Sequence, residues 1–332
     1  MQRPYFASRE EYGKRFTSVD YWQAYIASIC QRHNLAPYQQ IRAGKAGTHP
    51  VFIVDERYVV KLYAELFGGD ESFRKELDLY QLCAYAPELP VPQLITYGSL
   101  FAEGSEYHWP YTISTVIPGV PIGSVLSEIS FEDKLGVATA AGSFLHVFHR
   151  LPLEHSLMFE RSWEPFRAVL AYQRKHCIEH HRQWNALPQR LIAQIEDYLP
   201  PVESLFDQQT IPYLLHTDLF DDHVLGFLEH GCWHTNGIID LGDALVGDRL
   251  YELIALHIGL FHGDKRLLRA FMQTCGLTNA PEEEFVLKTM SFALLRQFNV
   301  FQQVFDDSPE ALTLPTLHEL ATFMWGDIHA SA

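Results

Sequence analysis

The sequence has few cysteines, and their arrangement excludes two common uses of the residue. The 332 residues include five cysteines, an odd number, and no two of them form a C-x-x-C pair. A disulfide framework and a cysteine-based zinc site both need paired or regularly spaced thiols. Scattered single cysteines are typical of reduced thiols, so the sequence predicts a cytoplasmic protein.

Long apolar runs are also missing. No stretch reaches the roughly 18 consecutive apolar residues that a membrane-spanning helix requires. The opening residues, MQRPYFASREEYGKRF, carry charges where a secretory signal would have an apolar segment. We therefore expect a protein without a membrane partner.

Positive charge is scarce. The chain has 25 lysines and arginines against 41 aspartates and glutamates, which gives a formal net charge of -16. Broad contact with a nucleic acid backbone needs a basic face, so we expect no nucleic acid partner. An acidic protein can attract a cationic small molecule. Hydrophobic residues make up 47% of the chain, which is enough for a sizeable core.

The first third of the chain reads as a small β-rich region with helices. Residues 9–33 and 71–86 have apolar residues at helical spacing. Residues 49–63 read as two short strands around a polar turn, and residues 89–100 and 109–117 as further strands. Proline and glycine then break the pattern in PGVPIG, residues 118–123.

The rest of the chain is mainly helical by the same criterion. The expected helical stretches are residues 131–151, 164–184, 189–199, 248–274 and 283–325. Residues 216–225 and 235–243 are the only segments here that resemble strands. We see no internal repeat and no low-complexity tract. The pattern predicts an α+β protein with a β-rich domain over 1–117 and a helical domain over 118–332.

Three features in the first domain are weak singly and informative together. A small-residue loop contains Gly44 and Gly47, the next strands carry Lys61, and the following helix carries Glu76. Kinase-like folds bind nucleotide phosphates through loop backbone, a lysine, and a glutamate that fixes the lysine. The order of these residues therefore indicates a nucleotide site.

The second domain supplies a matching set of polar residues. The segment HTDLFDDH places Asp218 five residues before His223, and Asp240 lies on a separate strand in GIIDLGD. Phosphoryl transfer to a hydroxyl needs a carboxylate near the acceptor and side chains that hold a metal against the phosphates. The spacing supplies one carboxylate and two metal ligands from two segments.

These motifs resemble the aminoglycoside phosphotransferase and choline-kinase-like branch of the protein-kinase fold. That branch has an H-x-D-x-x-x-x-N loop and a strand that ends I-I-D, followed by G-D and an apolar helix. Here the counterparts are HTDLFDDH and GIIDLGDALVGDRLYELIAL, and the resemblance covers about residues 40 to 260. It implies a bilobal protein-kinase-like fold with a small β-rich N-lobe and a larger, mainly helical C-lobe.

The resemblance also implies a function. It indicates a small-molecule kinase that transfers the γ-phosphoryl group of ATP or GTP to a hydroxyl of a small acceptor, such as an aminoglycoside or amino alcohol. The metal would be Mg²⁺ or Mn²⁺. In the implied site, Asp218 is the catalytic base, and His223 and Asp240 are the metal ligands. The phosphate-binding pair is Lys61 and Glu76, with the glycine loop at Gly44 and Gly47, and the hinge strand contributes Thr115 and Ile117.

His223 departs from the asparagine that this branch usually has. The aminoglycoside 2''-phosphotransferases also carry histidine there, so the resemblance implies a functional substitution and tolerance of other divalent ions. If His223 did not bind the metal, the chain would instead be a nucleotide-binding regulatory protein with a kinase fold. The resemblance assigns bracing roles to His216 and Asp248, and it leaves Asp221 and Asp222 either in a turn or at the acceptor.

Two other motifs compete with this interpretation. HTD also begins the H-x-D…H triad of Fe(II)/2-oxoglutarate oxygenases, with His257 or His262 as the distal histidine. That triad belongs on a β-barrel, whereas these histidines lie in a helical pattern. HCIEH, residues 176–180, matches the inverted zinc-peptidase motif, but its surroundings are polar on nearly all sides, as on a solvated helix face.

Overall fold

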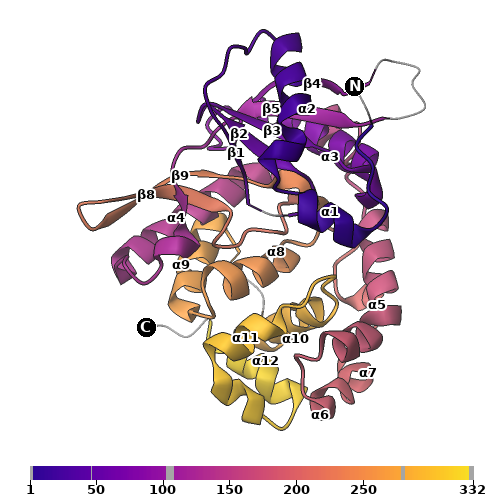
Figure 1. Cartoon of the computed structure of the whole chain (residues 1–332). Coiled ribbons are helices and arrows are strands. Elements are labelled where there is room, and N and C mark those ends of the chain that lie inside the picture. The colour runs from indigo at the N-terminus through magenta and orange to yellow at the C-terminus, as the bar shows by residue number, and fades with distance from the viewer. Residues whose placement is uncertain (1–2, 46, 102–107, 278–280, 329–332) are drawn as a thin grey trace. The chain divides into compact units, whose positions relative to one another are not determined.

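The computed structural model describes residues 3–45, 47–101, 108–277 and 281–328, and its chain forms two compact units. The first unit runs to Pro118 and also includes two later segments, Ser156–Met158 and Gly237–Gly242. The second unit contains the remaining residues. The first unit combines a β-sheet with helices, and helices dominate the second unit, which confirms the predicted α+β class (Figure 1).

The first unit is built on a five-stranded antiparallel sheet in the order β1-β2-β3-β5-β4. Its strands are β1 (Ile41–Ala43), β2 (Val51–Val54), β3 (Tyr58–Leu62), β4 (Leu94–Ser99) and β5 (Pro110–Thr115). The predicted turn between β2 and β3 places Asp55 and Glu56 at φ angles of 53° and 51°. Aspartate tolerates this left-handed conformation well. The strands predicted in residues 49–63 and 109–117 are confirmed.

Among the described residues of this unit, three α-helices accompany the sheet: α1 (Arg9–Arg15), α2 (Val19–Arg32) and α3 (Gly69–Cys83). The sequence pattern suggested continuous helical spacing over 9–33, but the chain turns between two helices there. Ser18 begins α2, and its side chain accepts a hydrogen bond from the Tyr21 amide. The buried side chains of α2, including Trp22, share a core with Phe52 and Val60 of the sheet. Burial of this apolar face fixes α2 on the sheet.

The second unit has nine helices in its described residues. They are α4 (Phe131–Phe148), α5 (Glu164–Trp184), α6 (Gln189–Ile192), α7 (Ile195–Tyr198), α8 (Arg249–Ala255), α9 (Lys265–Cys275), α10 (Glu282–Leu294), α11 (Phe301–Asp307) and α12 (Leu317–Trp325). Helix α4 packs along α9, while α10 packs against α8 and α12. Figure 1 shows α10, α11 and α12 grouped in yellow.

The helical stretch predicted over 248–274 is interrupted. Helix α8 continues into a π-helical turn, Leu256–Leu260, and the chain then reverses at His262 and Gly263, where φ is 48° and 75°. Asp264 starts α9 by accepting a hydrogen bond from the Arg266 amide. π-helical turns often occur at functional sites. The Gly259 carbonyl oxygen of this one accepts a hydrogen bond from the Asp221 amide at 3.3 Å.

Short strands of the second unit position its central loop. They are β6 (Val120–Pro121), β7 (Tyr213–Leu215), β8 (Val224–Glu229), β9 (Cys232–Ile238) and β10 (Leu245–Gly247). β7 pairs with β10, and β8 lies between β6 and β9. Residues 216–223 therefore form the loop between β7 and β8. The sequence pattern had indicated only the 216–225 region and residues 235–243 as strand-like here.

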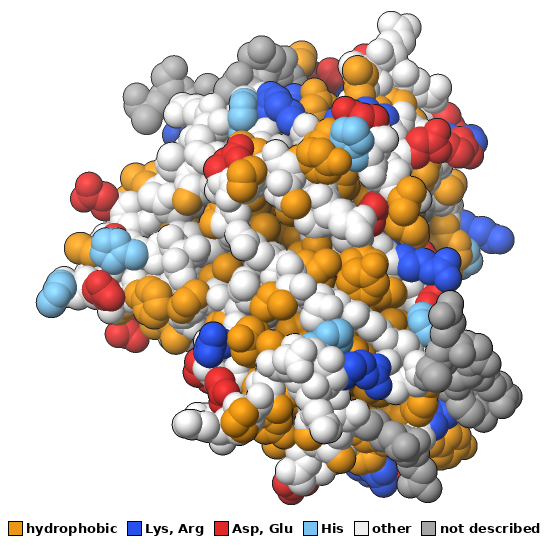
Figure 2. All heavy atoms as spheres, turned by 90° about the horizontal axis from the view of Figure 1, so that it is seen from above, with side chains coloured by type: hydrophobic (Ala, Val, Ile, Leu, Met, Phe, Trp, Pro, Cys, Tyr) orange, Lys and Arg blue, Asp and Glu red, His pale blue; other side chains and the backbone are white. Residues whose placement is uncertain are grey.

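The surface has no extended basic region on the face that Figure 2 shows. Lysine and arginine side chains are scattered there among acidic and apolar ones. Such a distribution is unlike the basic stripe of a nucleic-acid-binding face. Among the described residues, no helix combines the length and hydropathy needed to cross a membrane.

Candidate active site

Lys61 and Glu76 form a buried ion pair in the first unit. Lys61 Nζ on β3 lies 2.6 Å from Glu76 Oε2 on α3. The Tyr80 hydroxyl, one turn further along α3, donates to the other carboxylate oxygen at 3.3 Å. The carboxylate is thus held at both oxygens, and Glu76 is only 5% exposed. This arrangement fixes the position of the lysine ammonium group.

Asp240 reaches the same pair because the chain returns to the first unit. The Ile238 amide donates to the carbonyl oxygen of Pro90 at 2.8 Å. A Cβ at Gly237 would lie 2.7 Å from that oxygen, so the close approach requires glycine. The next turn places Asp240 Oδ1 3.6 Å from Lys61 Nζ. Asp240 itself has a φ of 64°, an unusual conformation that is common at functional sites.

The carboxylates keep Lys61 charged. Burial alone would lower the pKa of Lys61, but the carboxylates of Glu76 and Asp240 outweigh it, and the pKa is raised above its ordinary value. A permanent ammonium group between two carboxylates can neutralise phosphate oxygens. The structure therefore brings Lys61, Glu76 and Asp240 together in one unit.

The expected loop and hinge residues also lie in the first unit. The Gly44 amide donates to the Val51 carbonyl oxygen at 2.8 Å, whereas a Cβ at Gly47 would meet nothing within 4 Å. Thr115, at the end of β5, donates its amide to the Gln93 carbonyl oxygen at 2.9 Å. A base contact at Thr115 would thus use its carbonyl group. Ile117 packs against the Gly237 position.

The loop that follows β7 is held by a carboxylate the sequence analysis did not single out. Glu252 on α8 is fully buried and accepts hydrogen bonds from the amides of His216 and Thr217, each at 2.8 Å. Burial would raise the pKa of Glu252, but His149, His216 and the Thr217 amide outweigh it and lower the pKa. An ionised Glu252 satisfies two buried amides, so it fixes the backbone just before Asp218.

Arg296 braces the same segment from α10's C-terminal side. Its guanidinium group donates to the Thr217 carbonyl oxygen and lies 3.9 Å from Asp218 Oδ1. The Asp218 amide donates to His216 Nδ1 at 3.3 Å, the bracing contact expected of His216. Arg296 is 2% exposed and stacks over Tyr251. These contacts hold the Asp218 carboxylate in a fixed position.

His223 has a defined orientation. Its Nδ1 lies 2.5 Å from the backbone carbonyl oxygen of Asp218. A carbonyl oxygen only accepts, so Nδ1 carries the proton and Nε2 of the neutral ring carries the lone pair. Metal-binding histidines commonly have this arrangement. The imidazole nitrogen of His223 and the carboxylate oxygens of Asp218 and Asp240 are donor types that suit Mg²⁺ or Mn²⁺.

Asp221 contacts another part of the second unit. Its Oδ2 lies 3.5 Å from His262 Nε2, and His262 Nδ1 lies 3.0 Å from Asp307 Oδ2 on α11. The contact with Asp221 raises the pKa of His262, against the effect of burial, and Asp307 adds to the rise. Asp248, which was expected to brace the loop, caps the start of α8 by accepting a hydrogen bond from the Leu250 amide at 2.8 Å.

Glu252 was not predicted as a site residue, although the sequence contained a hint of its role. It is a single carboxylate among apolar residues of α8, and an acid in that setting needs buried partners. Arg296 had no such signal, and His262 had been considered only as an iron ligand, because the contacts of both residues with the loop arise only in three dimensions.

The oxygenase interpretation is wrong. His257 lies in the π-helical turn and is hydrogen-bonded to the Met324 carbonyl oxygen at 3.0 Å, while His262 contacts two carboxylates. Within the described ranges, neither histidine belongs to a group of three side chains close enough to bind a metal. The same holds for His176 and His180, which lie on α5, so the zinc-peptidase motif is also a chance match.

The fold and these residues define a kinase-like protein, and comparison with known families agrees. Residues 39–284 match the model of the phosphotransferase enzyme family. The chain belongs to this family. The match confirms the predicted relationship to the aminoglycoside phosphotransferase family.

Solved structures share the fold. An aminoglycoside 2''-phosphotransferase IIIa bound to GDP and kanamycin is 17% identical, with a TM-score of 0.63 over 81% of this chain and 87% of the other. A type IIa enzyme in a complex with streptomycin and ATP is 18% identical, with a TM-score of 0.58 over 90% of this chain and 98% of the other.

One curated relative is much longer. Lysine-specific demethylase JMJ21 of Arabidopsis thaliana is 23% identical over an alignment that covers 93% of this chain and 45% of the relative. The chain therefore spans less than half the length of that protein.

Proposed function

We propose that the protein transfers the γ-phosphoryl group of ATP or GTP to a hydroxyl group of a small molecule. The observation that carries the proposal is the buried Lys61–Glu76 pair with the Asp240 carboxylate 3.6 Å from the lysine. A lysine fixed by a glutamate is what a kinase-like fold uses to bind nucleotide phosphates. Structures with this fold that contain GDP, ADP or ATP support a nucleotide co-substrate.

Each proposed residue has a distinct task. Lys61 neutralises phosphate oxygens, with Glu76 as its positioning residue. The backbone at Gly44 and Gly47 approaches the phosphates, and the hinge strand at Ile117 meets the base. His223 and Asp240 would each offer a ligand atom to Mg²⁺ or Mn²⁺, and the bound ion would neutralise charge on the transferred phosphoryl group.

Asp218 is the proposed base. The acceptor oxygen forms a bond to the γ-phosphorus while the bond from that phosphorus to the β–γ bridging oxygen breaks. The hydroxyl proton passes to the Asp218 carboxylate, and the nucleoside diphosphate leaves. Glu252 and Arg296 hold the loop so that the carboxylate is in place before the acceptor binds.

The test is the Asp218→Ala variant, with Asp197→Ala on the exposed surface of α7 as the charge-matched control. Nucleotide binding is measured by calorimetry and transfer by a coupled assay over a panel of hydroxyl acceptors. We expect Asp218→Ala to lose about 100-fold or more in kcat and to bind nucleotide normally. Wild-type turnover in that variant would overturn the assignment. Nucleotide binding by the wild type without transfer to any acceptor would favour a regulatory nucleotide-binding protein.

A further inference from the structure

His49, at the end of the small-residue loop, lies on the same face of the first unit's sheet as Lys61. The Leu62 amide donates to the Pro50 carbonyl oxygen at 2.9 Å, which extends the pairing of β2 with β3 by one residue. His49 is therefore opposite Tyr63. Successive side chains of a strand point to opposite faces, so Tyr63 and Lys61, two residues apart, share one face with His49.

The His49 ring and the Lys61 ammonium group lie against the same tyrosine. The ring centroids of His49 and Tyr63 are 5.1 Å apart, and Lys61 Nζ is 5.7 Å from the centroid of the Tyr63 ring. Tyr63 is fully buried, and its hydroxyl lies 3.2 Å from Thr112 Oγ1 on β5. A fixed aromatic ring thus supports both the lysine proposed to bind phosphate and the imidazole of His49.

The tautomer of His49 is set by the backbone. The Ala64 amide donates to His49 Nδ1 at 3.2 Å. Nδ1 therefore carries the lone pair, and in the neutral ring the proton is on Nε2. Burial, and after it the charge of Lys61, lowers the pKa of His49 to about 4, so the ring is neutral near pH 7. His49 thus presents an N–H group through Nε2.

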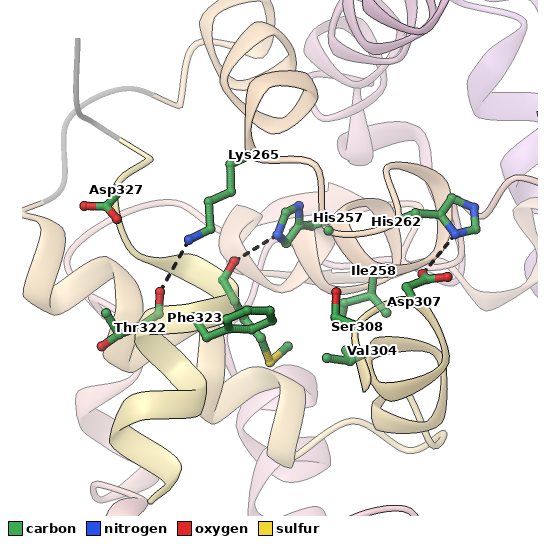
Figure 3. Close-up of a pocket in the computed structure, with 12 residues that line it drawn as sticks. His257, Ile258, His262, Lys265, Val304, Asp307, Ser308, Thr322, Phe323 and Asp327 are labelled. Carbon is green, nitrogen blue, oxygen red and sulfur yellow. Dashed lines mark hydrogen bonds and ion pairs between the residues drawn. The ribbon is translucent and has the colours of Figure 1, made fainter. Parts of the chain in front are cut away.

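This N–H group is not used within the protein. Among the described residues, none accepts a hydrogen bond from His49 Nε2, and this nitrogen is not one of the fully buried polar atoms without a partner, so it keeps accessible surface. Two buried histidines of the second unit differ. His257 Nε2 donates to the Met324 carbonyl oxygen at 3.0 Å (Figure 3), and His181 Nε2 donates to that of Leu294 at 2.9 Å. His49 instead leaves its donor to an acceptor outside the protein.

The backbone beside His49 is anchored as well. The Tyr12 hydroxyl on α1 donates to the Thr48 carbonyl oxygen at 2.9 Å, and Tyr12 is only 3% exposed. His49 is therefore held on one side by α1 and on the other by the Ala64 amide. A donor that is fixed before its ligand arrives loses little conformational entropy on binding. An N–H group that donates to a phosphate oxygen forms a strong, charge-assisted hydrogen bond.

We propose that His49 is a phosphate-binding residue whose Nε2–H group donates to a phosphate oxygen of the nucleotide, beside the Lys61 ammonium group. It adds a neutral side-chain donor to a site where the loop otherwise offers its backbone. This inference rests on the proposed kinase function and assigns a further contact to the nucleotide.

Two substitutions test the donor. His49→Phe keeps an aromatic ring against Tyr63 and removes the N–H group, whereas His49→Gln keeps a carbonyl oxygen for the Ala64 amide and an N–H group for the phosphate. Calorimetry measures the affinities of ATP and GTP with Mg²⁺, and competition measures those of adenosine and guanosine. We expect His49→Phe to raise the Kd of the nucleotide about tenfold or more and to leave that of its nucleoside within about threefold.

The control variants should bind as the wild type does. His49→Gln should keep the nucleotide Kd within about threefold, because it restores the donor. His108→Phe replaces an exposed histidine of the same unit and should change neither affinity.

The wild-type protein provides a second measurement if His49→Phe fails to fold. In protein labelled with ¹⁵N-histidine, the Nε2 signal of His49 is identified by its absence from His49→Gln. This signal should shift when the nucleotide and Mg²⁺ bind, and it should stay in place when the nucleoside binds.

The outcomes separate this inference from the kinase function. Wild-type nucleotide affinity in His49→Phe, an equal loss for nucleotide and nucleoside, or an Nε2 signal that the nucleotide leaves in place would overturn the role of His49. The kinase function would stand in each case if Lys61→Met weakened nucleotide binding. A wild-type protein that bound neither ATP nor GTP would overturn both.

Discussion

His223 Nδ1 lies 2.5 Å from the backbone carbonyl oxygen of Asp218, so the side chain of one proposed site residue is oriented by the backbone of another. The bond sets the tautomer of the imidazole and leaves Nε2 as a potential ligand. In the sequence, His223 was the residue that departed from the usual asparagine. The hydrogen bond gives a physical reason why histidine suits this position.

Replacing His223 tests its role as a ligand. We expect His223→Phe to lower kcat by about 100-fold or more, because metal neutralisation of phosphoryl charge is worth several kcal/mol. His223→Asn keeps a ligand of a harder type, so it should retain activity with Mg²⁺ and lose part of the activity with Mn²⁺. The measurement is kcat over a titration of each ion. Equal activity of both variants with both ions would rule out a ligand role.

Because Lys61 and Glu76 form a buried ion pair, we expect substitutions at these two residues to have non-additive effects on the free energy of unfolding. Lys61→Met should lower the free energy of unfolding by about 3 kcal/mol, because it leaves the Glu76 carboxylate buried without its cation. The double variant Lys61→Met, Glu76→Gln removes both charges and should recover much of that stability. Both should bind nucleotide more weakly than the wild type. Urea unfolding and calorimetry measure the two effects.

Lys75→Met is the matched control for that experiment. Lys75 forms an exposed pair with Glu71 one turn along the same helix, and such pairs contribute at most about 1 kcal/mol. If Lys61→Met and Lys75→Met destabilised the protein equally, the buried pair would have no special role.

Glu252 should be essential for stability and for the position of the loop. Glu252→Ala leaves the His216 and Thr217 amides buried and unsatisfied, at about 1–3 kcal/mol each. We expect a loss of about 3 kcal/mol in the free energy of unfolding and a fall in kcat larger than the change in nucleotide affinity. Chemical denaturation and single-turnover kinetics provide the measurements. The control is Glu284→Ala, which removes an exposed carboxylate from α10 and should cost at most about 1 kcal/mol.

His262 predicts a pH dependence with a definite sign. The contacts with Asp221 and Asp307 raise its pKa above the ordinary 6.5 of the unfolded chain. The stabilisation from these contacts is therefore complete below about pH 6.5 and is lost as the pH rises through the folded-state pKa. His262→Gln should flatten the fall in thermal stability between about pH 6.5 and pH 8. His318→Gln, on the exposed side of α12, should leave that slope intact, and identical slopes in all three proteins would contradict the prediction.

Some of the site was readable from the sequence because its residues act over short distances along the chain. Asp218 and His223 share one loop, and the spacing between them set their backbone contact. Lys61 and Glu76 follow from the order strand, then helix, which a kinase-like fold repeats. The first glycine of GIIDLGD, by contrast, has a cause that lies far away in the chain, since Gly237 approaches the Pro90 carbonyl oxygen closely.

Other relationships were fixed only by packing. Glu252 reaches the amides of His216 and Thr217 across 36 and 35 residues of chain, and Arg296 reaches Thr217 across 79. Hydrophobic periodicity reports which face of a helix is buried, but it carries no information on which helix lies opposite. The sequence thus predicted most of the helices and strands, and it pointed to the residues proposed for the site. Tertiary structure decided the buried carboxylate that holds the loop and the π-helical turn that follows α8.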